Sequence, residues 1–210
     1  MGKYDEKDND LVPVLEEPTG DETGEASTTL MPDSAPLLFS KVTLLEQCLR
    51  LSVKPIGFTK FMQELLLGIM RTIPCEASSF IELTPDGQSL FFRAAVGYRS
   101  DSIVKFLIPR GQGIAGQALE KHKLVQLSSE SMSQHHLKAL EDAVGFETHN
   151  LVAIPIIING TPFGVFELIN RHGESDFTER DLEVLNYVRF YLSKTIEIRL
   201  LLNSKESAVA

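Results

Sequence analysis

Two charged residues on predicted strands of this 210-residue chain have side chains that could bind a small polar molecule. In the strand expected over 90–96, alternation places Phe91, Arg93 and Ala95 on one face. Glu167 stands in the middle of the last apolar run, where a carboxylate requires a polar partner. These residues either line a ligand pocket or, as the alternative, Arg93 and Glu167 form a cross-strand pair that faces solvent.

Other patterns argue against catalysis and against a bound metal or cofactor. Gly111, Gly113 and Gly116 fit the G-x-G-x-x-G pattern of dinucleotide-binding proteins, but no parallel βαβ unit surrounds them. A tight turn and close packing of a helix explain these glycines better. The five histidines lack metal-ligand spacing, and Cys48 and Cys75 form no CxxC pair. No Ser/His/Asp or paired-carboxylate spacing suggests a reaction, so we expect no catalytic residue.

The charge of the chain is concentrated at its N-terminus. Of the net charge of -9, residues 1–36 carry -8, because acidic residues there greatly outnumber Lys3 and Lys7. This composition predicts a disordered acidic tail, whose apolar run 11–15 is either a docking motif for a partner protein or incidental. The nearly neutral remainder argues against nucleic-acid binding. Without a signal peptide or membrane span, the chain is expected in the cytoplasm, with no membrane partner.

Apolar periodicity and turn residues predict an α+β domain built around an antiparallel sheet. The turns Pro85-Asp86-Gly87 and Asn159-Gly160 are expected to close two β-hairpins. Hairpins that are separated by helices are typical of an antiparallel sheet with helices on its faces. The pattern predicts helices over 37–53, 55–73, 111–121, 135–143 and 178–202, and strands over 79–84, 90–96, 124–127, 151–158 and 163–170.

Four segments, in this order, resemble a GAF domain, the small-molecule-sensing module of phosphodiesterases, cyclases and bacterial regulators. They read FTKFMQELLLGIMRTIPCEASSFIEL, LFFRAAVG, IPRGQGIAGQALEKHKLVQL and GFETHNLVAIPIIINGTPFGVFELIN. The resemblance covers about residues 55–195. It implies a six-stranded antiparallel sheet whose first and last helices pack on one face, with the ligand under short helices on the other. The predicted organisation is an N-terminal helix over 37–54, the GAF-like domain over 55–203 and a flexible end over 204–210.

The resemblance also adds polar residues to the expected ligand site. Thr148 and His149 precede the strand at 151, at the rim where GAF ligands are usually held. Ser128, Ser129 and His136 offer further hydrogen-bonding groups near the short helices. Together with Phe91, Arg93 and Glu167, these residues form the predicted site for a small polar ligand.

A degenerate signature after the last strand is similar to that of cyclic-nucleotide-binding GAF domains. That signature reads Asn-Lys, then Phe-x3-Asp-Glu. Here Asn170, Phe177 and Asp181 match it, Arg171 keeps the cation, and Leu182 replaces the terminal Glu. The resemblance implies an ion pair between Arg171 and Asp181 that pins the loop beside the pocket without touching the ligand, and Arg can make such a pair bidentately. A cyclic nucleotide is therefore one candidate ligand.

The apolar surface of the last predicted helix is wider than one sheet face can cover. Leu185, Val188, Leu192 and Ile196 form one stripe, while further apolar residues lie elsewhere on the helix: Phe190, Tyr191, Ile198 and Leu201. Together with the helix over 37–53, this width predicts a helical bundle between two protomers, that is, a homodimer.

These observations predict a non-enzymatic regulatory module that senses a small polar ligand and signals in trans through its helices. The alternative is a scaffold or protein-interaction module whose pocket is filled with side chains.

Overall fold

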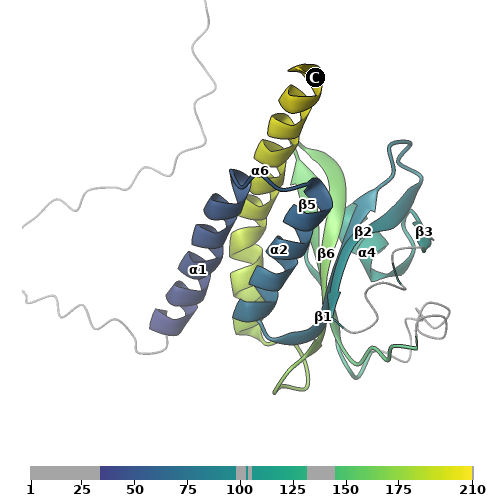
Figure 1. The fold of residues 1–210 in the computed structure, drawn as a ribbon. Coiled ribbons are helices and arrows are strands. Elements are labelled where there is room, and N and C mark those ends of the chain that lie inside the picture. Colours follow the sequence, from purple (N-terminus) through teal and green to yellow (C-terminus); the bar gives the residue numbers. More distant parts are fainter. Residues whose placement is uncertain (1–33, 98–102, 104–105, 132–144, 210) are drawn as a thin grey trace, which may run out of the picture. The chain divides into compact units, whose positions relative to one another are not determined.

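Two β-hairpins and four helices make up most of the chain that the structure describes. The computed structural model describes residues 34–97, 103, 106–131 and 145–209, drawn in colour in Figure 1. The helices are α1 (Ser34–Ser52), α2 (Phe58–Thr72), α4 (Gly113–Lys121) and α6 (Glu179–Val209). The strands are β1 (Cys75–Leu83), β2 (Ser89–Gly97), β3 (Leu107–Pro109), β4 (Val125–Leu127), β5 (Leu151–Ile158) and β6 (Thr161–Arg171).

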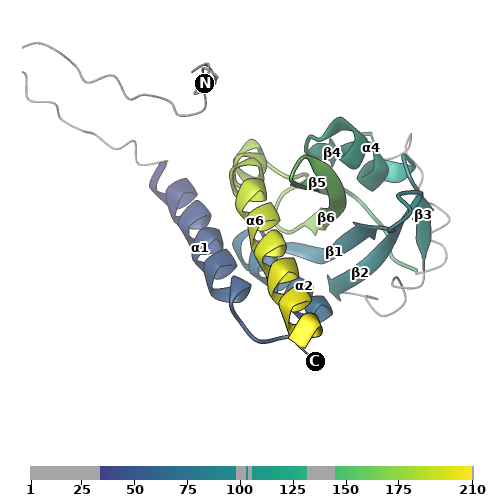
Figure 2. The ribbon, with the colours of Figure 1, turned by 90° about the horizontal axis from the view of Figure 1, so that it is seen from above.

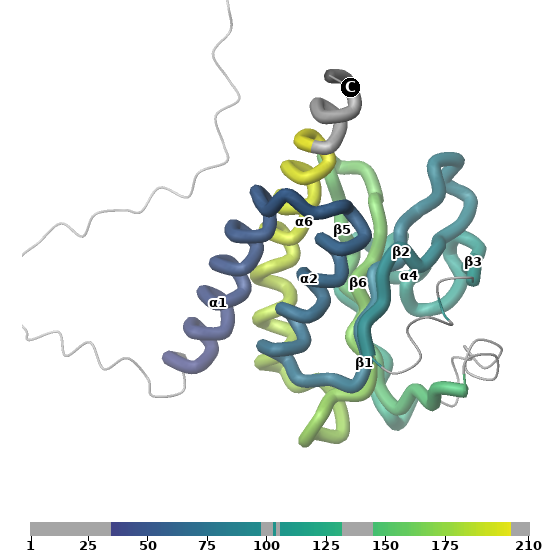
Figure 3. Tube along the Cα trace, in the orientation of Figure 1, coloured from purple at the N-terminus to yellow at the C-terminus, as the bar shows by residue number. Residues whose placement is uncertain are grey.

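The six strands form one antiparallel sheet in the order β3-β2-β1-β6-β5-β4. The central pair is β1 and β6, which lie side by side although most of the domain separates them in sequence (Figure 3). Asn159 and Gly160 close the β5–β6 hairpin with φ angles of 50° and 76°, the positive values that a type I′ turn requires. The predicted α+β fold with a six-stranded antiparallel sheet is thus confirmed.

Helices α2 and α6 cover one face of the sheet, which we call the bundle face, and α1 packs on these two helices from outside (Figure 2). Helix α2 turns its apolar stripe inward, with Phe61, Met62 and Leu66 fully buried. They pack with Phe80 of β1 and Phe166 of β6, whose rings lie 4.8 Å apart. This face holds the larger of the two hydrophobic cores.

Helix α4 covers the opposite face, which we call the α4 face. Its core is smaller and contains Ile114, Ala115, Ala118 and Leu119 of α4 against residues of all the longer strands. Gly116 lies so close to the backbone of Gly111 that an added Cβ would overlap it. These glycines therefore permit a tight approach to the helix start, as the sequence predicts, and there is no parallel βαβ unit around them among the described residues.

Several element bounds differ from those predicted. Helix α1 begins at Ser34 rather than at 37, and α6 continues to Val209, beyond the predicted end at 202. Strand β3 is short and lacks an alternating pattern, so the sequence offered no signal for it. The acidic segment 1–33 and the helix predicted over 135–143 lie outside the described residues.

Candidate functional site

A row of four side chains crosses the α4 face at the centre of the sheet. Glu167 of β6 is the register partner of Ser79 on β1 and of Ala153 on β5, and Ser79 is in turn the partner of Ala95 on β2. Register partners in a sheet point to the same face. Val165 and Ile169, the alternate residues of β6, pack in the α4 core, which fixes the face of Glu167.

Glu167 is a buried carboxylate with little to compensate it. The residue is 4% exposed. Ser79 Oγ donates to its Oε2 over 3.2 Å and is the one hydrogen-bond partner of the carboxylate among the described residues. Burial raises the pKa of Glu167 from 4.5 to about 7, because an ionised carboxylate loses its hydration there, and the bond from Ser79 offsets this only in part. The carboxyl is thus poised to ionise or to hold a proton near neutral pH.

The neighbours of Glu167 within the row are small. Apart from the glutamate, the row holds nothing larger than a serine, and alanines recur in the same core at Ala77, Ala115 and Ala118. The carboxyl group of Glu167 therefore lies among small and mostly apolar side chains. This is the arrangement that binding sites use, where a few polar groups orient a ligand on an apolar floor.

Phe91 and Arg93 lie on the bundle face, away from Glu167. In the β1–β2 register Phe80 pairs with Ala94 and Ile81 with Phe92, so Arg93 is the extra residue of a β-bulge. The bulge reverses the alternation, and Ala95 alone of the predicted trio shares the α4 face with Glu167. The expectation that Phe91, Arg93 and Ala95 share one face is therefore corrected.

Arg93 has its own partner on that face. Its Nε donates to Glu82 Oε2 over 2.7 Å and its Nη2 donates to Glu82 Oε1 over 3.1 Å. The guanidinium also lies 4.7 Å from the ring centre of Phe91 and 6.0 Å from that of Phe58 in α2. The alternative of an Arg93–Glu167 cross-strand pair is thus wrong as well. The partner of Arg93 that the sequence analysis missed is Glu82, which the strand register places opposite Phe91.

Ser128 and Ser129, two of the predicted ligand-site residues, form hydrogen bonds with other residues of the protein. Ser128 N donates to Ser131 Oγ over 3.1 Å. Ser129 donates from its N and its Oγ to the carboxylate of Asp176, over 2.8 and 3.1 Å, which fastens the end of β4 to the loop before α6. His136 lies outside the described residues.

Thr148 and His149 lie in the segment that leads into β5. The backbone N of His149 donates to Asn170 Oδ1 over 2.7 Å, while its side chain is more than half exposed. The structure thus brings His149 to the signature residue Asn170.

Asn170 organises the end of β6. Its backbone has a positive φ of 59°, which asparagine tolerates better than most residues. Its Nδ2 donates to the carboxylate of Glu76 and to the carbonyl of Glu147, both over 2.8 Å. Since Oδ1 accepts from the segment before β5, one side chain joins three parts of the chain.

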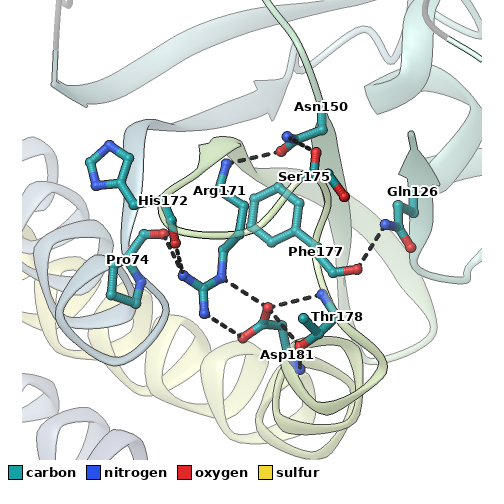
Figure 4. Close-up of polar contacts among 9 residues, drawn as sticks. All are labelled: Pro74, Gln126, Asn150, Arg171, His172, Ser175, Phe177, Thr178 and Asp181. Atoms are coloured by element: carbon teal, nitrogen blue, oxygen red, sulfur yellow. Dashed lines mark hydrogen bonds and ion pairs between the residues drawn. The ribbon is translucent and has the colours of Figure 1, made fainter. Parts of the chain in front are cut away.

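Arg171 and Asp181 form the ion pair that the signature implies (Figure 4). Arg171 Nε donates to Asp181 Oδ2 over 2.9 Å, and Nη1 donates to the carbonyls of Pro74 and His172. Asp181 also accepts from the N and Oγ1 of Thr178, so it caps α6. Phe177 packs in the bundle-face core, and its carbonyl accepts from Gln126. The signature therefore fastens the end of β6 to the start of α6.

The two cysteines are buried in the bundle-face core, not beside Glu167. Burial raises the pKa of Cys48 to about 11 and that of Cys75 to about 12, so both thiols are protonated at neutral pH. Within the described residues no group of His, Cys, Asp and Glu side chains could hold a metal ion. No described helix combines the length and the apolar composition that a bilayer crossing needs.

Comparison with known proteins adds a family and a set of similar folds. The model of a GAF domain matches residues 57–197. The structure is similar to a GAF domain of a phosphoenolpyruvate-protein phosphotransferase from Coxiella burnetii, at 16% identity and a TM-score of 0.65, over 79% of this chain and 98% of that one.

Two further solved structures resemble the chain. A free methionine-R-sulfoxide reductase from Neisseria meningitidis, in complex with its substrate, is 16% identical with a TM-score of 0.62, over 79% of this chain and 92% of that one. A GAF domain from A. aeolicus in an inactive state is 18% identical with a TM-score of 0.61, over 78% and 99%. At these identities the likeness shows the shared fold.

Proposed function

The chain belongs to the GAF domain family, and from this premise we propose that it is a regulatory module that binds a small polar ligand on the α4 face. The observation that carries the proposal is the buried carboxylate of Glu167, which has a single hydrogen-bond partner in the described part of the chain. A buried charge without full compensation costs stability, and such costs are characteristic of functional sites.

The chemistry of Glu167 defines the ligand class. A carboxylate accepts hydrogen bonds, so the complementary group is a donor such as an amine, an amidine or the exocyclic amino group of a purine. Cyclic nucleotides carry such an amino group when the base is adenine or guanine. They belong among the candidates for this reason and because Asn170, Arg171, Phe177 and Asp181 retain most of the signature.

The positions of the cysteines support a binding role rather than catalysis. Redox chemistry requires a thiolate, whereas Cys48 and Cys75 are buried thiols with raised pKa values on the bundle face. Ser79 Oγ and the Glu167 carboxylate lie within hydrogen-bond reach of each other, but among the described residues no third side chain orients the carboxylate as the base of a nucleophilic enzyme is oriented.

One strand and one ion pair connect the proposed ligand site to the last helix. Glu167 and Arg171 are both on β6, and Arg171 holds Asp181 at the start of α6. A ligand that shifts β6 would therefore shift the anchor of α6. Coupling of this kind is typically worth about 1–3 kcal/mol.

The outer face of α6 supports transmission through a homodimer. Tyr187, Tyr191 and Ile198 recur at heptad spacing and remain 38–44% exposed, and Phe190 beside them is 60% exposed. Helix α1 presents further exposed apolar residues, Leu38, Phe39, Val42 and Leu49, and Val53 follows directly after its end. Apolar surface of this extent on two adjacent helices is typical of a protein interface.

Thermal melting with a panel of amines, amino acids, purines and cyclic nucleotides tests the ligand proposal. A ligand at 100 times its dissociation constant should stabilise the protein by about 2.7 kcal/mol. Glu167→Gln should abolish that gain, and Arg93→Gln, which removes a charge on the bundle face, should retain it. No stabilisation by any compound would favour the scaffold alternative.

Light scattering tests the dimer. Tyr191→Glu combined with Ile198→Glu should convert a dimer to a monomer, because two carboxylates would be buried in the apolar contact. Asn186→Glu, which adds charge at an exposed polar position of α6, is the control. A dimer that survives the double substitution contradicts interface formation by α6.

A further inference from the structure

A surface cavity of about 460 Å³ opens where the end of α1 meets α2, on the bundle side of the sheet. We propose that it is a second binding site, selective for a small phosphate-bearing anion. Helix α1 and the link after it contribute four lining residues and α2 contributes two: Gln47, Arg50, Leu51 and Lys54, and Glu64 and Arg71. The proposal is independent of the ligand site at Glu167, which faces the other side of the sheet.

The charge of this cavity is positive and uncompensated. Arg50, Lys54 and Arg71 are exposed, and none of the three has an ion pair within the part of the chain that the structure describes. The single acid of the lining, Glu64, already pairs with Lys60 over 3.4 Å. Three free cations converging on one hollow raise the local concentration of anions.

Single cations without an ion pair, such as Arg110 and Arg180, also occur elsewhere in the described residues. The α1–α2 cavity differs in that three such cations line one hollow. Two guanidinium groups are suited to phosphate, because each can donate two parallel hydrogen bonds to its oxygens.

The floor of the cavity is held rigidly. Gln47 is 7% exposed, and its Nε2 donates to the carbonyl of Glu64 over 3.1 Å. Its amide lies directly on Gly68 of α2, where an added Cβ would overlap it. This close contact fixes the separation of α1 and α2 before any ligand arrives, and a preformed site loses less entropy on binding.

The cavity borders a contact between α6 and the link that follows α1. Arg199 of α6 is 5% exposed and donates from Nη1 to the carbonyl of Lys54 over 2.8 Å, and from Nη2 to the carbonyl of Ile56. Lys54 therefore contributes a side chain to the cavity and a backbone acceptor to α6. An anion that draws Lys54 toward Arg50 and Arg71 would act on α6 through this link.

Isothermal titration with inorganic pyrophosphate tests the site in the full chain. The unmodified protein should bind with one saturable site, and Arg50→Gln combined with Arg71→Gln should weaken binding at least tenfold. Arg110→Gln combined with Arg180→Gln removes the same charge from two exposed positions elsewhere and should change the affinity less than twofold. Circular dichroism should show all three proteins equally folded, since surface substitutions of this kind have small effects.

A second arm of the experiment separates a free phosphate compound from a lipid headgroup. Sedimentation with phosphatidic acid vesicles that depends on Arg50 and Arg71, and that pyrophosphate displaces, would assign the site to a headgroup. Pyrophosphate binding without vesicle binding would assign it to a free compound. Equal weakening in both double variants, or no binding of either probe, would overturn the proposal, and neither result bears on Glu167.

Discussion

The two faces of the sheet both carry apolar cores but differ in the side chains at their centres. The bundle face carries rings that are wholly buried, such as Phe61, Phe80 and Phe166, beneath α2 and α6. The α4 face carries a row of alanines and a serine around the carboxylate of Glu167, beneath one short helix. Large apolar side chains contribute most of the free energy of folding, whereas a buried carboxylate lowers it. The comparison teaches that packing on the bundle face supplies stability that offsets the cost of the buried carboxylate on the α4 face.

The largest expected change in stability follows from removing a buried ring from the bundle face. Phe166→Ala removes a fully buried ring from contact with Phe80 and should lower the free energy of unfolding by about 4 kcal/mol, from lost burial and the cavity left behind. Urea denaturation measures it. A loss below about 1 kcal/mol would show that this face is not the main source of stability.

The next largest loss of stability tests the Arg171–Asp181 ion pair, which joins β6 to α6. Asp181→Ala leaves Arg171, whose side chain is 15% exposed, without its partner, and it removes the cap of α6. We expect a loss of about 3 kcal/mol in urea denaturation. Glu183→Ala breaks the exposed pair with Lys41 and should cost less than about 1 kcal/mol. Equal losses of stability in Asp181→Ala and Glu183→Ala would contradict the importance of the Arg171–Asp181 ion pair.

Glu167→Gln tests the α4 face, and here we expect the substitution to raise the free energy of unfolding rather than to lower it. The folded pKa of about 7 exceeds the ordinary value of 4.5, so the folded state holds the proton more tightly, and stability falls as pH rises from about 4.5 through 7. The variant should therefore be more stable than the parent by about 3 kcal/mol at pH 8 and no more stable at pH 4. Denaturation at both pH values measures the difference, and a pH-independent difference would contradict the assignment.

The smallest effect concerns Ser79. Its hydroxyl donates to Glu167 and lowers the pKa of that carboxyl, so Ser79→Ala should raise the pKa above about 7. The loss of one hydrogen bond should also cost about 1 kcal/mol above that pH. Carbon-detected NMR titration of the Glu167 carboxyl reports the pKa directly, and a downward shift would show that Ser79 is not its donor.

The fold was largely predictable because its signals are local. The Asn159-Gly160 turn sets the register of β5 and β6, and the spacing of apolar residues in α2 matches the buried stripe. Arg171 and Asp181 could be paired from the signature alone. The family followed from the same segments, and the family match over residues 57–197 confirms it.

The site was less predictable because it depends on a register that the sequence does not mark. The bulge at Arg93 places Phe91 and Arg93 on the bundle face, and neither neighbour of Arg93 is a glycine or a proline that would indicate a bulge. The Glu82–Arg93 pair and the Ser79–Glu167 bond both join residues across strands. Such pairs become visible only when the strands are aligned, so Glu167 was found by its polarity and its partner was missed.

The pairing of β1 with β6 has a consequence for the biosynthesis of the protein. Ser79 and Glu167 are 88 residues apart, so the two central strands cannot pair until nearly the whole domain has left the ribosome. Contacts between such distant segments make folding slow. Until β6 arrives, β1 exposes an unpaired edge, and nascent chains are then most vulnerable to aggregation and most dependent on chaperones.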